Sequence, residues 1–193
     1  MDLDRQRAID NLKALGMKTA DRVLGQYAQK GPFAALESGL IDADEFHRQM
    51  RALIDGEASD EAIDNAFIAF LTGIPLHRLQ QLRMLRTSFK VYMLSNTNPI
   101  MWESEIKRQF RQEGFEINDY FDGIVTSFEA KAMKPDPTIF SYAASKLGIS
   151  PDETLFLDDS ADNCKAAVDL GWHAVKVDPG SEFLQLVQNY LEQ

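Results

Sequence analysis

Five polar residues that could bind a phosphate and a metal ion follow three short apolar segments of the chain. Ser95 and Asn96 come directly after one segment, Asp158 and Asp159 after another, and Lys134 lies in a polar turn after the third. A hydroxyl, main-chain N–H groups and an ammonium suit phosphate oxygens, whereas adjacent carboxylates suit Mg²⁺, a hard cation that prefers oxygen ligands. These residues therefore predict a site for a small phosphorylated molecule, with Mg²⁺ as the cofactor.

Strands and helices alternate from Lys90 onward, and this alternation can position the five residues. Short apolar, β-prone runs predict strands at residues 90–94, 123–126, 154–157 and 175–177. Amphipathic segments between and after them predict helices, one of which starts at Pro137 with Asp136 as its N-cap. This alternation predicts an α/β fold with a doubly wound parallel sheet, in which ligands bind beyond the carboxyl ends of the strands.

The chain before Phe89 has a helical pattern, and none of its segments reads as a strand. Asp4, Asp42 and Ser59 each stand before a run with apolar residues at helical spacing, which predicts three capped helices. We therefore expect a small helical bundle ahead of the α/β part.

The composition is that of an acidic globular protein. The 193 residues are 45% hydrophobic and 26% charged, with a formal net charge of −10 and an isoelectric point near 4.7. Such a surface repels nucleic acid, and no apolar run reaches the roughly 20 residues that a membrane-spanning helix needs. The single cysteine, Cys164, excludes an internal disulfide bond, so we expect a cytoplasmic protein that binds neither nucleic acid nor membranes. The composition makes no prediction of the oligomeric state.

Three motifs resemble those of the haloacid dehalogenase-like hydrolase superfamily: Leu94-Ser95-Asn96, Lys134-Pro135-Asp136, and Leu157-Asp158-Asp159-Ser160 with Asn163. Residues 95–98 and 158–163 are most similar to members that resemble bacterial α-D-glucose-1-phosphate phosphatase. The resemblance implies a Rossmann-like core with an N-terminal helical cap. We expect residues 1–15 to link into the cap, residues 16–86 to form it, and residues 87–193 to form the core.

The resemblance also implies a role for each residue of the predicted site. Ser95 Oγ and the main-chain N–H of Asn96 would hold phosphoryl oxygens, and Lys134 would neutralise their charge and orient the nucleophile. Asp159 would bind Mg²⁺ directly or through water, with Asp158 beside it as a ligand or as a neighbour of the ligands. In a phosphoryl transfer the protein mainly positions groups and compensates charge, which such a set can do.

The superfamily's first motif is an aspartate pair that ends the first strand and supplies the nucleophile. Asp2-Leu3-Asp4 has a similar form, but no apolar β run precedes it and a helix follows at once. We therefore interpret Asp4 as a helix cap and Asp2 as a solvated residue, and we assign the nucleophile to no residue. We also expect the first central strand to be missing from its place between the strands at residues 154–157 and 90–94.

Two residues of the cap, Phe33 and Glu37, are candidates for contacting the substrate, because related caps use this region to select substrates. The three histidines, His47, His77 and His173, show no metal-ligand spacing, and we assign them no catalytic role. Cys164 lies on the inward face of a predicted helix, where it would be a small buried hydrophobic residue.

The leading hypothesis is a Mg²⁺-dependent phosphomonoesterase that acts on a small sugar phosphate through an aspartyl-phosphate. We expect residues 1–193 alone to be inactive, because the segment with the nucleophile is absent. A 2-haloacid dehalogenase is one alternative, although that chemistry needs no metal and leaves the Asp158-Asp159 pair without a purpose. The other alternative is a non-catalytic relative that binds phosphate or a protein partner, which would account for the missing nucleophile.

Overall fold

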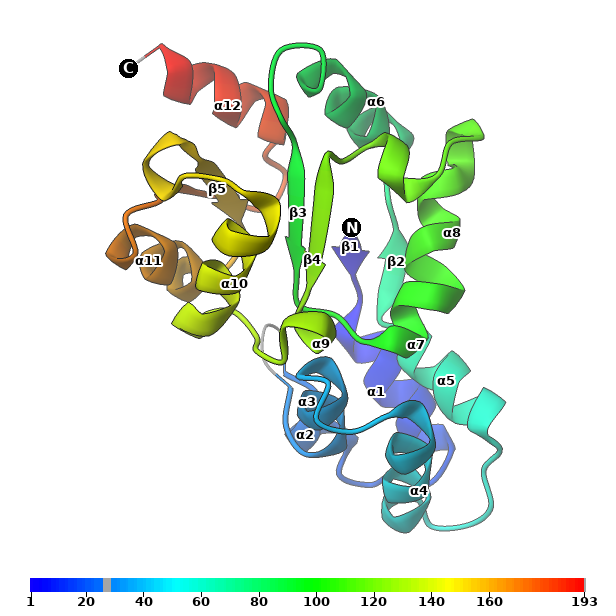
Figure 1. Cartoon of the computed structure of the whole chain (residues 1–193). Coiled ribbons are helices and arrows are strands. Elements are labelled where there is room, and N and C mark those ends of the chain that lie inside the picture. The colour runs from blue at the N-terminus through cyan, green and yellow to red at the C-terminus, as the bar shows by residue number, and fades with distance from the viewer. Residues whose placement is uncertain (26–28, 193) are drawn as a thin grey trace. The chain divides into compact units, whose positions relative to one another are not determined.

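The computed structural model describes residues 1–25 and 29–192. The chain forms two compact units. Unit 1 comprises Met1–Leu76 and Thr97–Ile117, and unit 2 comprises His77–Asn96 and Asn118–Gln193. Figure 1 labels the helices and strands of both units along the chain.

Unit 1 is mainly helical, as the sequence predicts. Its elements include α1 (Arg5–Ala14), α2 (Ala20–Val23), α3 (Pro32–Glu37), α4 (Ala43–Leu53), α5 (Asp60–Ile68), α7 (Pro99–Met101), the π-helical turn η1 (Trp102–Ile106), α8 (Lys107–Phe110) and η2 (Arg111–Glu113). The three predicted caps are confirmed, because Asp4, Asp42 and Ser59 each accept a hydrogen bond from the main-chain N–H three residues further on. Each cap satisfies an N–H group that the first turn of a helix leaves without a partner.

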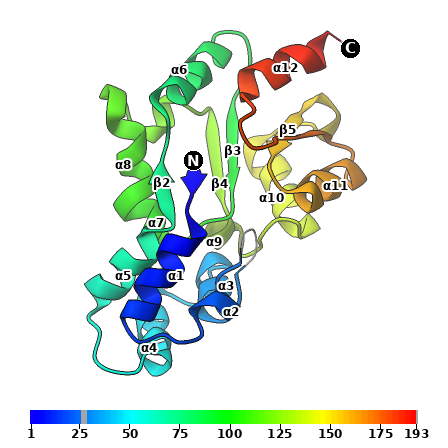
Figure 2. The same cartoon turned by 180° about the vertical axis from the view of Figure 1, so that it is seen from behind.

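An aromatic cluster forms the core of the helices between α3 and α5. Phe33, Phe46 and Phe67 are almost completely buried, and their ring centroids lie 4.6–5.7 Å apart. Two of the three pairs meet edge to face, an arrangement that adds about 0.5–1.5 kcal/mol per pair to the burial of the rings. Figure 2 shows α1 from behind, with α5 beside it.

Two short strands in unit 1 contradict the prediction that no strand occurs before Phe89. β1 (Asp2–Leu3) pairs in an antiparallel ladder with β2 (Leu71–Gly73). The next residue, Asp4, extends the contact because its N–H donates to the carbonyl of Phe70 at 2.8 Å. The ladder joins segments about 70 positions apart, and both strands are too short to show an alternating pattern in sequence.

Unit 2 has the alternating order of strands and helices that the sequence predicts. Its elements are α6 (Leu76–Leu85, whose first residue belongs to unit 1), β3 (Tyr92–Ser95), η3 (Ile117–Asp119, likewise), β4 (Gly123–Thr126), α9 (Ser127–Ala130), α10 (Pro137–Leu147), η4 (Pro151–Glu153), β5 (Leu155–Asp158), α11 (Ala161–Asp169), β6 (His173–Lys176) and α12 (Phe183–Leu191). Asp136 caps α10 as expected, because its side chain accepts a hydrogen bond from the N–H of Thr138 at 2.8 Å.

The strands of unit 2 form two separate parallel ladders. β3 pairs with β4, with Tyr92 opposite Gly123, and β5 pairs with β6, with Leu155 opposite His173. In the part of the chain that the structure describes, no strand joins β3 to β5. The sequence predicts this interruption between β3 and β5.

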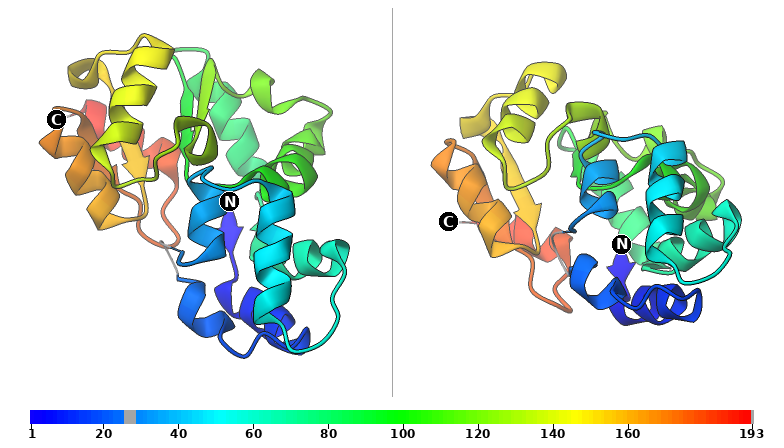
Figure 3. Two further views of the ribbon diagram at one scale, coloured as in Figure 1. Left: turned by 60° about the horizontal axis from the view of Figure 1, so that its bottom comes forward. Right: turned by 90° about the horizontal axis from the view of Figure 1, so that it is seen from below.

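The core of unit 2 lies between its helices and β5. Phe140 of α10 packs edge to face against Phe156 of β5 and against Trp172, with ring centroids 5.5 and 5.9 Å away. Figure 3 shows α10 and α11 beside β5. This packing fixes the position of β5, whose last residue is Asp158, and of the turn that leads from Lys134 into α10.

Candidate functional site

Lys134 connects the carboxyl ends of β3 and β5. Its Nζ donates hydrogen bonds to the carbonyl oxygen of Leu94, at 2.9 Å, and to Oδ2 of Asp158, at 2.7 Å. The ammonium also lies 5.5 Å from the ring centre of Phe156, within the range of a cation–π interaction. Only 10% of the Lys134 side chain and 6% of the Asp158 side chain are exposed, so their ion pair is shielded from water.

Asn96 fixes the main chain of the Lys134 turn. Its side-chain Nδ2 donates to the carbonyl oxygen of Lys134 at 2.9 Å, and its Oδ1 accepts from the N–H of Lys134 at 2.8 Å. The Asn96 amide thus gives the main chain of Lys134 the two hydrogen bonds that a neighbouring strand would otherwise give it. The residue after β3 therefore sets the position from which the lysine reaches the site.

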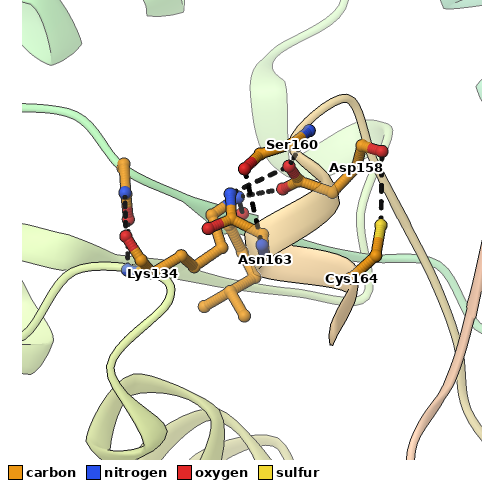
Figure 4. Close-up of polar contacts among 7 residues, drawn as sticks. Lys134, Asp158, Ser160, Asn163 and Cys164 are labelled. Carbon is orange, nitrogen blue, oxygen red and sulfur yellow. Dashed lines mark hydrogen bonds and ion pairs between the residues drawn. The ribbon is translucent and has the colours of Figure 1, made fainter. Parts of the chain in front are cut away.

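Asp158 is held by groups of its own loop as well as by Lys134. Its Oδ1 accepts hydrogen bonds from the N–H of Ser160 and from Nδ2 of Asn163, both at 2.9 Å, as Figure 4 shows. Asn163 therefore steadies this loop. The next residue, Asp159, is exposed, and no other described residue binds its side chain. Three protein donors thus engage Asp158, while Asp159 is available to an external ligand.

Ser95 is the last residue of β3. It lies between Leu94, whose carbonyl oxygen accepts from Lys134, and Asn96, whose side chain holds the Lys134 turn. The side chain is half-buried, and its hydroxyl makes no hydrogen bond with another described residue. The hydroxyl can therefore serve a ligand at this end of the sheet.

Cys164 lies on the other side of Asp158, where its thiol contacts the Asp158 carbonyl oxygen at 3.5 Å. Burial raises the pKa of this thiol, as expected of a buried cysteine without a redox or nucleophilic role.

The structure brings together the residues that the sequence selects from unit 2. Ser95, Asn96, Lys134, Asp158 and Asp159 all lie at the carboxyl ends of β3 and β5 or in the turn that joins them through Lys134. The group offers a hydroxyl, an ammonium and one free carboxylate. Such a set can bind a phosphate and a divalent cation, but none of its described members is a carboxylate aimed at a phosphorus atom.

The two cap residues have different environments in unit 1. Phe33 is completely buried in the aromatic cluster, so a substrate could touch it only if the cluster opened. Glu37, the last residue of α3, is 8% exposed, and its side chain has no hydrogen-bond partner among the described residues. Burial without a partner raises the pKa of Glu37 to about 8, because the charged form loses its hydration.

Two contacts of the site have no signal in the sequence. The Asn96 side chain binds a main chain 38 positions away, and Phe156 places its ring beside the Lys134 ammonium from the neighbouring strand. From the sequence, Asn96 has a predicted role only through its own N–H group, and Phe156 has only a place in a predicted strand. An aromatic residue two positions before a strand-end aspartate is the one pattern that could have drawn attention to Phe156.

Comparison with known proteins places this site in a family. Residues 32–171 match the haloacid dehalogenase-like hydrolases. D-ribitol-5-phosphate phosphatase from Bacteroides thetaiotaomicron is 35% identical over 185 residues, which are 96% of this chain and 90% of that protein. The chain therefore belongs to the haloacid dehalogenase-like hydrolases.

Solved structures of similar proteins have the same fold. One is a haloacid dehalogenase family enzyme from Bacteroides thetaiotaomicron, an aspartate-to-alanine variant in complex with magnesium and inorganic phosphate. It is 38% identical, with a TM-score of 0.92, and the match covers 96% of this chain and 92% of that one. Another is a predicted haloacid dehalogenase-like hydrolase from Porphyromonas gingivalis, 28% identical with a TM-score of 0.91, covering 100% of this chain and 93% of that one. The α/β fold of the family is thus confirmed.

Within residues 1–25 and 29–192, no helix has both the length and the apolar character needed to cross a membrane.

Proposed function

We propose that this chain is a Mg²⁺-dependent phosphomonoesterase for a small phosphorylated sugar or sugar alcohol. The observation that carries the proposal is the position of the Lys134 ammonium, held between the Leu94 carbonyl and Asp158 beside the hydroxyl of Ser95. A relative named for D-ribitol 5-phosphate and a similar structure with magnesium and phosphate support the substrate class and the metal.

Each residue of the site has a part in this function. Ser95 Oγ and the N–H of Asn96 hold the oxygens of the phosphoryl group, and Lys134 compensates their negative charge. Asn96 also keeps Lys134 in place through the two hydrogen bonds between its side chain and the lysine main chain. These contacts stabilise charge that develops on the phosphoryl oxygens, which is the main contribution of a protein to such a transfer.

The oxygen donors of the site fit Mg²⁺ in kind. Asp159 presents an exposed carboxylate, whereas both oxygens of Asp158 already accept hydrogen bonds, so Asp159 is the direct ligand and Asp158 supports the loop. Among residues 1–25 and 29–192, no group of three or more acidic, histidine or cysteine side chains could hold a metal ion. When bound, Mg²⁺ would neutralise phosphate charge, and it keeps several waters while using one or two carboxylates.

We assign the nucleophile to no described residue, and we propose that residues 1–193 alone do not turn over substrate. Asp4 is occupied as the cap of α1, and Asp2 lies in β1, paired with β2 in unit 1. A carboxylate near Lys134 and Asp159 would have to come from a segment placed between β3 and β5. Phosphatase activity would then require that segment.

The test compares the chain alone with a version that carries an added amino-terminal strand ending in an aspartate pair. Hydrolysis of D-ribitol 5-phosphate and of p-nitrophenyl phosphate is measured with Mg²⁺ and with EDTA. We expect turnover only in the extended chain with Mg²⁺, and its loss in the Lys134→Met variant of that chain. A folded, extended chain without phosphatase activity would refute the proposed reaction, and turnover by the chain alone would refute the assignment of the nucleophile.

Two further measurements on the same proteins, chloride release and substrate binding, separate the two alternatives. Chloride release from 2-chloropropionate that EDTA leaves unchanged would favour a 2-haloacid dehalogenase. Binding of D-ribitol 5-phosphate without hydrolysis, even by the extended chain, would favour a non-catalytic relative.

We further propose a cytoplasmic protein, since its one cysteine is a free buried thiol and its net charge is −10.

Our proposed domains remain a linking helix at residues 1–15, a cap at residues 16–86 and a core at residues 87–193. Limited proteolysis followed by mass spectrometry of the fragments tests these boundaries. Phe33 and Glu37 remain our candidates for contacting the substrate from the proposed cap.

A further inference from the structure

Phe156 and Asp158 lie on the same face of β5. Side chains two positions apart on a strand point to the same side, and these two are buried, whereas Leu155 and Leu157 are half-buried. Both buried side chains reach the ammonium of Lys134: Asp158 accepts a hydrogen bond from Nζ at 2.7 Å, and Nζ stands over the Phe156 ring, 5.5 Å from its centre. The spacing along one strand therefore gives Lys134 an anion and an aromatic face side by side.

Two aromatic neighbours hold the Phe156 ring in one orientation. The ring meets Phe140 at an interplanar angle of 79° and Trp172 at 73°, both edge to face, with centroid distances of 5.5 and 6.4 Å. All three side chains are almost completely buried. Edge-to-face pairs set the positive edge of one ring against the negative face of the other, so turning the Phe156 ring would disturb both contacts. Its face consequently stays toward the ammonium.

The same rings are tied to the turn that carries Lys134. Asp136, two positions after the lysine, caps α10, and Phe140 lies in the first turn of that helix. The packing of Phe140 against Phe156 therefore fixes the helix that follows the Lys134 turn, while the Phe156 ring itself contacts the end of the lysine side chain. The main chain and the charged group of Lys134 thus depend on one aromatic cluster.

The ring stabilises the charge of Lys134 without accepting one of its hydrogen bonds. An ammonium has three N–H donors, and the bonds to Leu94 and Asp158 leave one of them for a ligand. At 5.5 Å the ring centre is too far to accept a hydrogen bond but within the distance of about 6 Å over which an aromatic face attracts a cation. This attraction is stronger where the cation is shielded from water, as Lys134 is. A carbonyl or carboxylate in place of the ring would stabilise the same charge but would take the remaining N–H.

From these contacts we propose that Phe156 is a positioning residue for the Lys134 ammonium. Its ring holds the ammonium in place and keeps one N–H free to donate to an oxygen of a bound phosphate. The role toward phosphate rests on the proposed function, whereas the contact between ring and ammonium exists without any ligand. Weakening the negative face of the ring should therefore lower both the stability of the protein and its affinity for phosphate.

Fluorinated phenylalanines weaken the ring face with little change of shape, because fluorine withdraws electron density from the ring. Phe156 is replaced through a reassigned codon with 4-fluoro-, 3,5-difluoro- and 3,4,5-trifluorophenylalanine. The same three replacements of Phe140 are the matched controls, since this ring belongs to the same cluster and no described cation lies over it. A change in packing affects both positions, whereas a change in the attraction for Lys134 affects position 156 alone.

Isothermal titration calorimetry with inorganic phosphate, in the presence of Mg²⁺, measures the effect on the ligand. We expect the affinity to fall with each fluorine at position 156, by about threefold or more with three of them, and to change little with the same groups at position 140. The fluorine NMR signal of 4-fluorophenylalanine at position 156 should also shift as phosphate is added, and the signal at position 140 should not. Equal losses of affinity at both positions, or none at position 156, would overturn the proposal.

Urea unfolding tests the contact between ring and ammonium without a ligand. Three fluorines at position 156 should lower the urea midpoint of the unmodified protein by about 0.3 M or more and leave the midpoint of Lys134→Met unchanged, because the cation is absent there. Where Lys134→Met does not fold, the comparison of positions 156 and 140 in the unmodified protein decides. Equal loss of stability in both comparisons would refute the contact and the positioning role with it. A loss confined to position 156, in proteins that all fail to bind phosphate, would instead refute the proposed function and the role toward phosphate, and would leave the contact established.

Discussion

Glu37 makes the stability of the protein depend on pH in a direction opposite to that of most carboxylates. Burial raises its pKa from 4.5 to about 8, so the folded chain keeps this group protonated at neutral pH, whereas the unfolded chain ionises it. Below about pH 4.5 both states are protonated and the group has no effect. As the pH rises from about 4.5 to 8, the unfolded state releases a proton that the folded state retains, so stability falls.

The size of the effect follows from the shift. One pKa unit corresponds to about 1.4 kcal/mol, and about 2.5 units separate the ordinary pKa from pH 7, which gives a loss of about 3 kcal/mol at that pH. Glu37→Gln keeps the shape of the side chain and cannot ionise, so it avoids this loss. For a chain of this size, about 3 kcal/mol corresponds to a rise in Tm of about 6–12 °C.

Thermal unfolding followed by circular dichroism, between pH 4.5 and pH 8 at constant ionic strength, measures the difference between the two proteins. We expect Glu37→Gln to gain in Tm over the unmodified protein steadily with pH. Glu61→Gln is the matched control, because Glu61 is an exposed glutamate in the first turn of α5 of the same unit. A difference between Glu37→Gln and the unmodified protein that stays constant over this range would refute the reasoning.

Three further predictions concern unit 2. Lys134→Met leaves the carboxylate of Asp158 buried without its cation, so urea unfolding should show a loss of about 3–5 kcal/mol, and a loss below about 1 kcal/mol would mean that water reaches the pair. Asn96→Ala removes both hydrogen bonds to the Lys134 main chain and should cost about 1–3 kcal/mol in the same assay, with faster exchange of the Lys134 N–H as the local sign. Asp122→Asn acts through pH: hydrogen bonds, first from Arg86, lower the pKa of Asp122 to about 2, so the stabilisation exists above about pH 4 and disappears as the pH falls toward 2. Because water partly screens this pair, we expect a difference of about 1 kcal/mol at pH 7 and none at pH 2, and an unchanged difference at both would contradict the assignment.

The sequence predicts those parts of the structure that depend on local chemistry. Asp42 and Ser59 cap their helices because an N-cap needs only a suitable side chain and the three residues after it. The strands at Leu94 and Asp158 are recognisable because short apolar runs end in polar turns. The sequence therefore predicts that candidate site residues gather at the ends of these strands.

The contacts that the sequence does not predict are those between distant segments. β1 and β2 have two and three residues, and only the folding of unit 1 brings them together. The hydrogen bonds of Asn96 depend on where the Lys134 turn passes, and a local pattern contains no information about that path. Glu37 reads as an ordinary helical glutamate, and only the packing around α3 shows that it is buried.

The hydrogen bonds of Asp158 decide which carboxylate of the site is open to a metal ion. Its carboxylate already accepts three hydrogen bonds, which leaves Asp159 as the one carboxylate of the site that no described residue engages. A single exposed carboxylate holds Mg²⁺ weakly, because this ion keeps its waters unless further oxygen ligands replace them. The strand with an aspartate pair that is added in the test of the proposed function would supply a further carboxylate. Isothermal titration calorimetry should therefore show at least tenfold tighter Mg²⁺ binding by the extended chain than by the chain alone. Equal Mg²⁺ affinity of the two would show that Asp158 and Asp159 hold the ion without help.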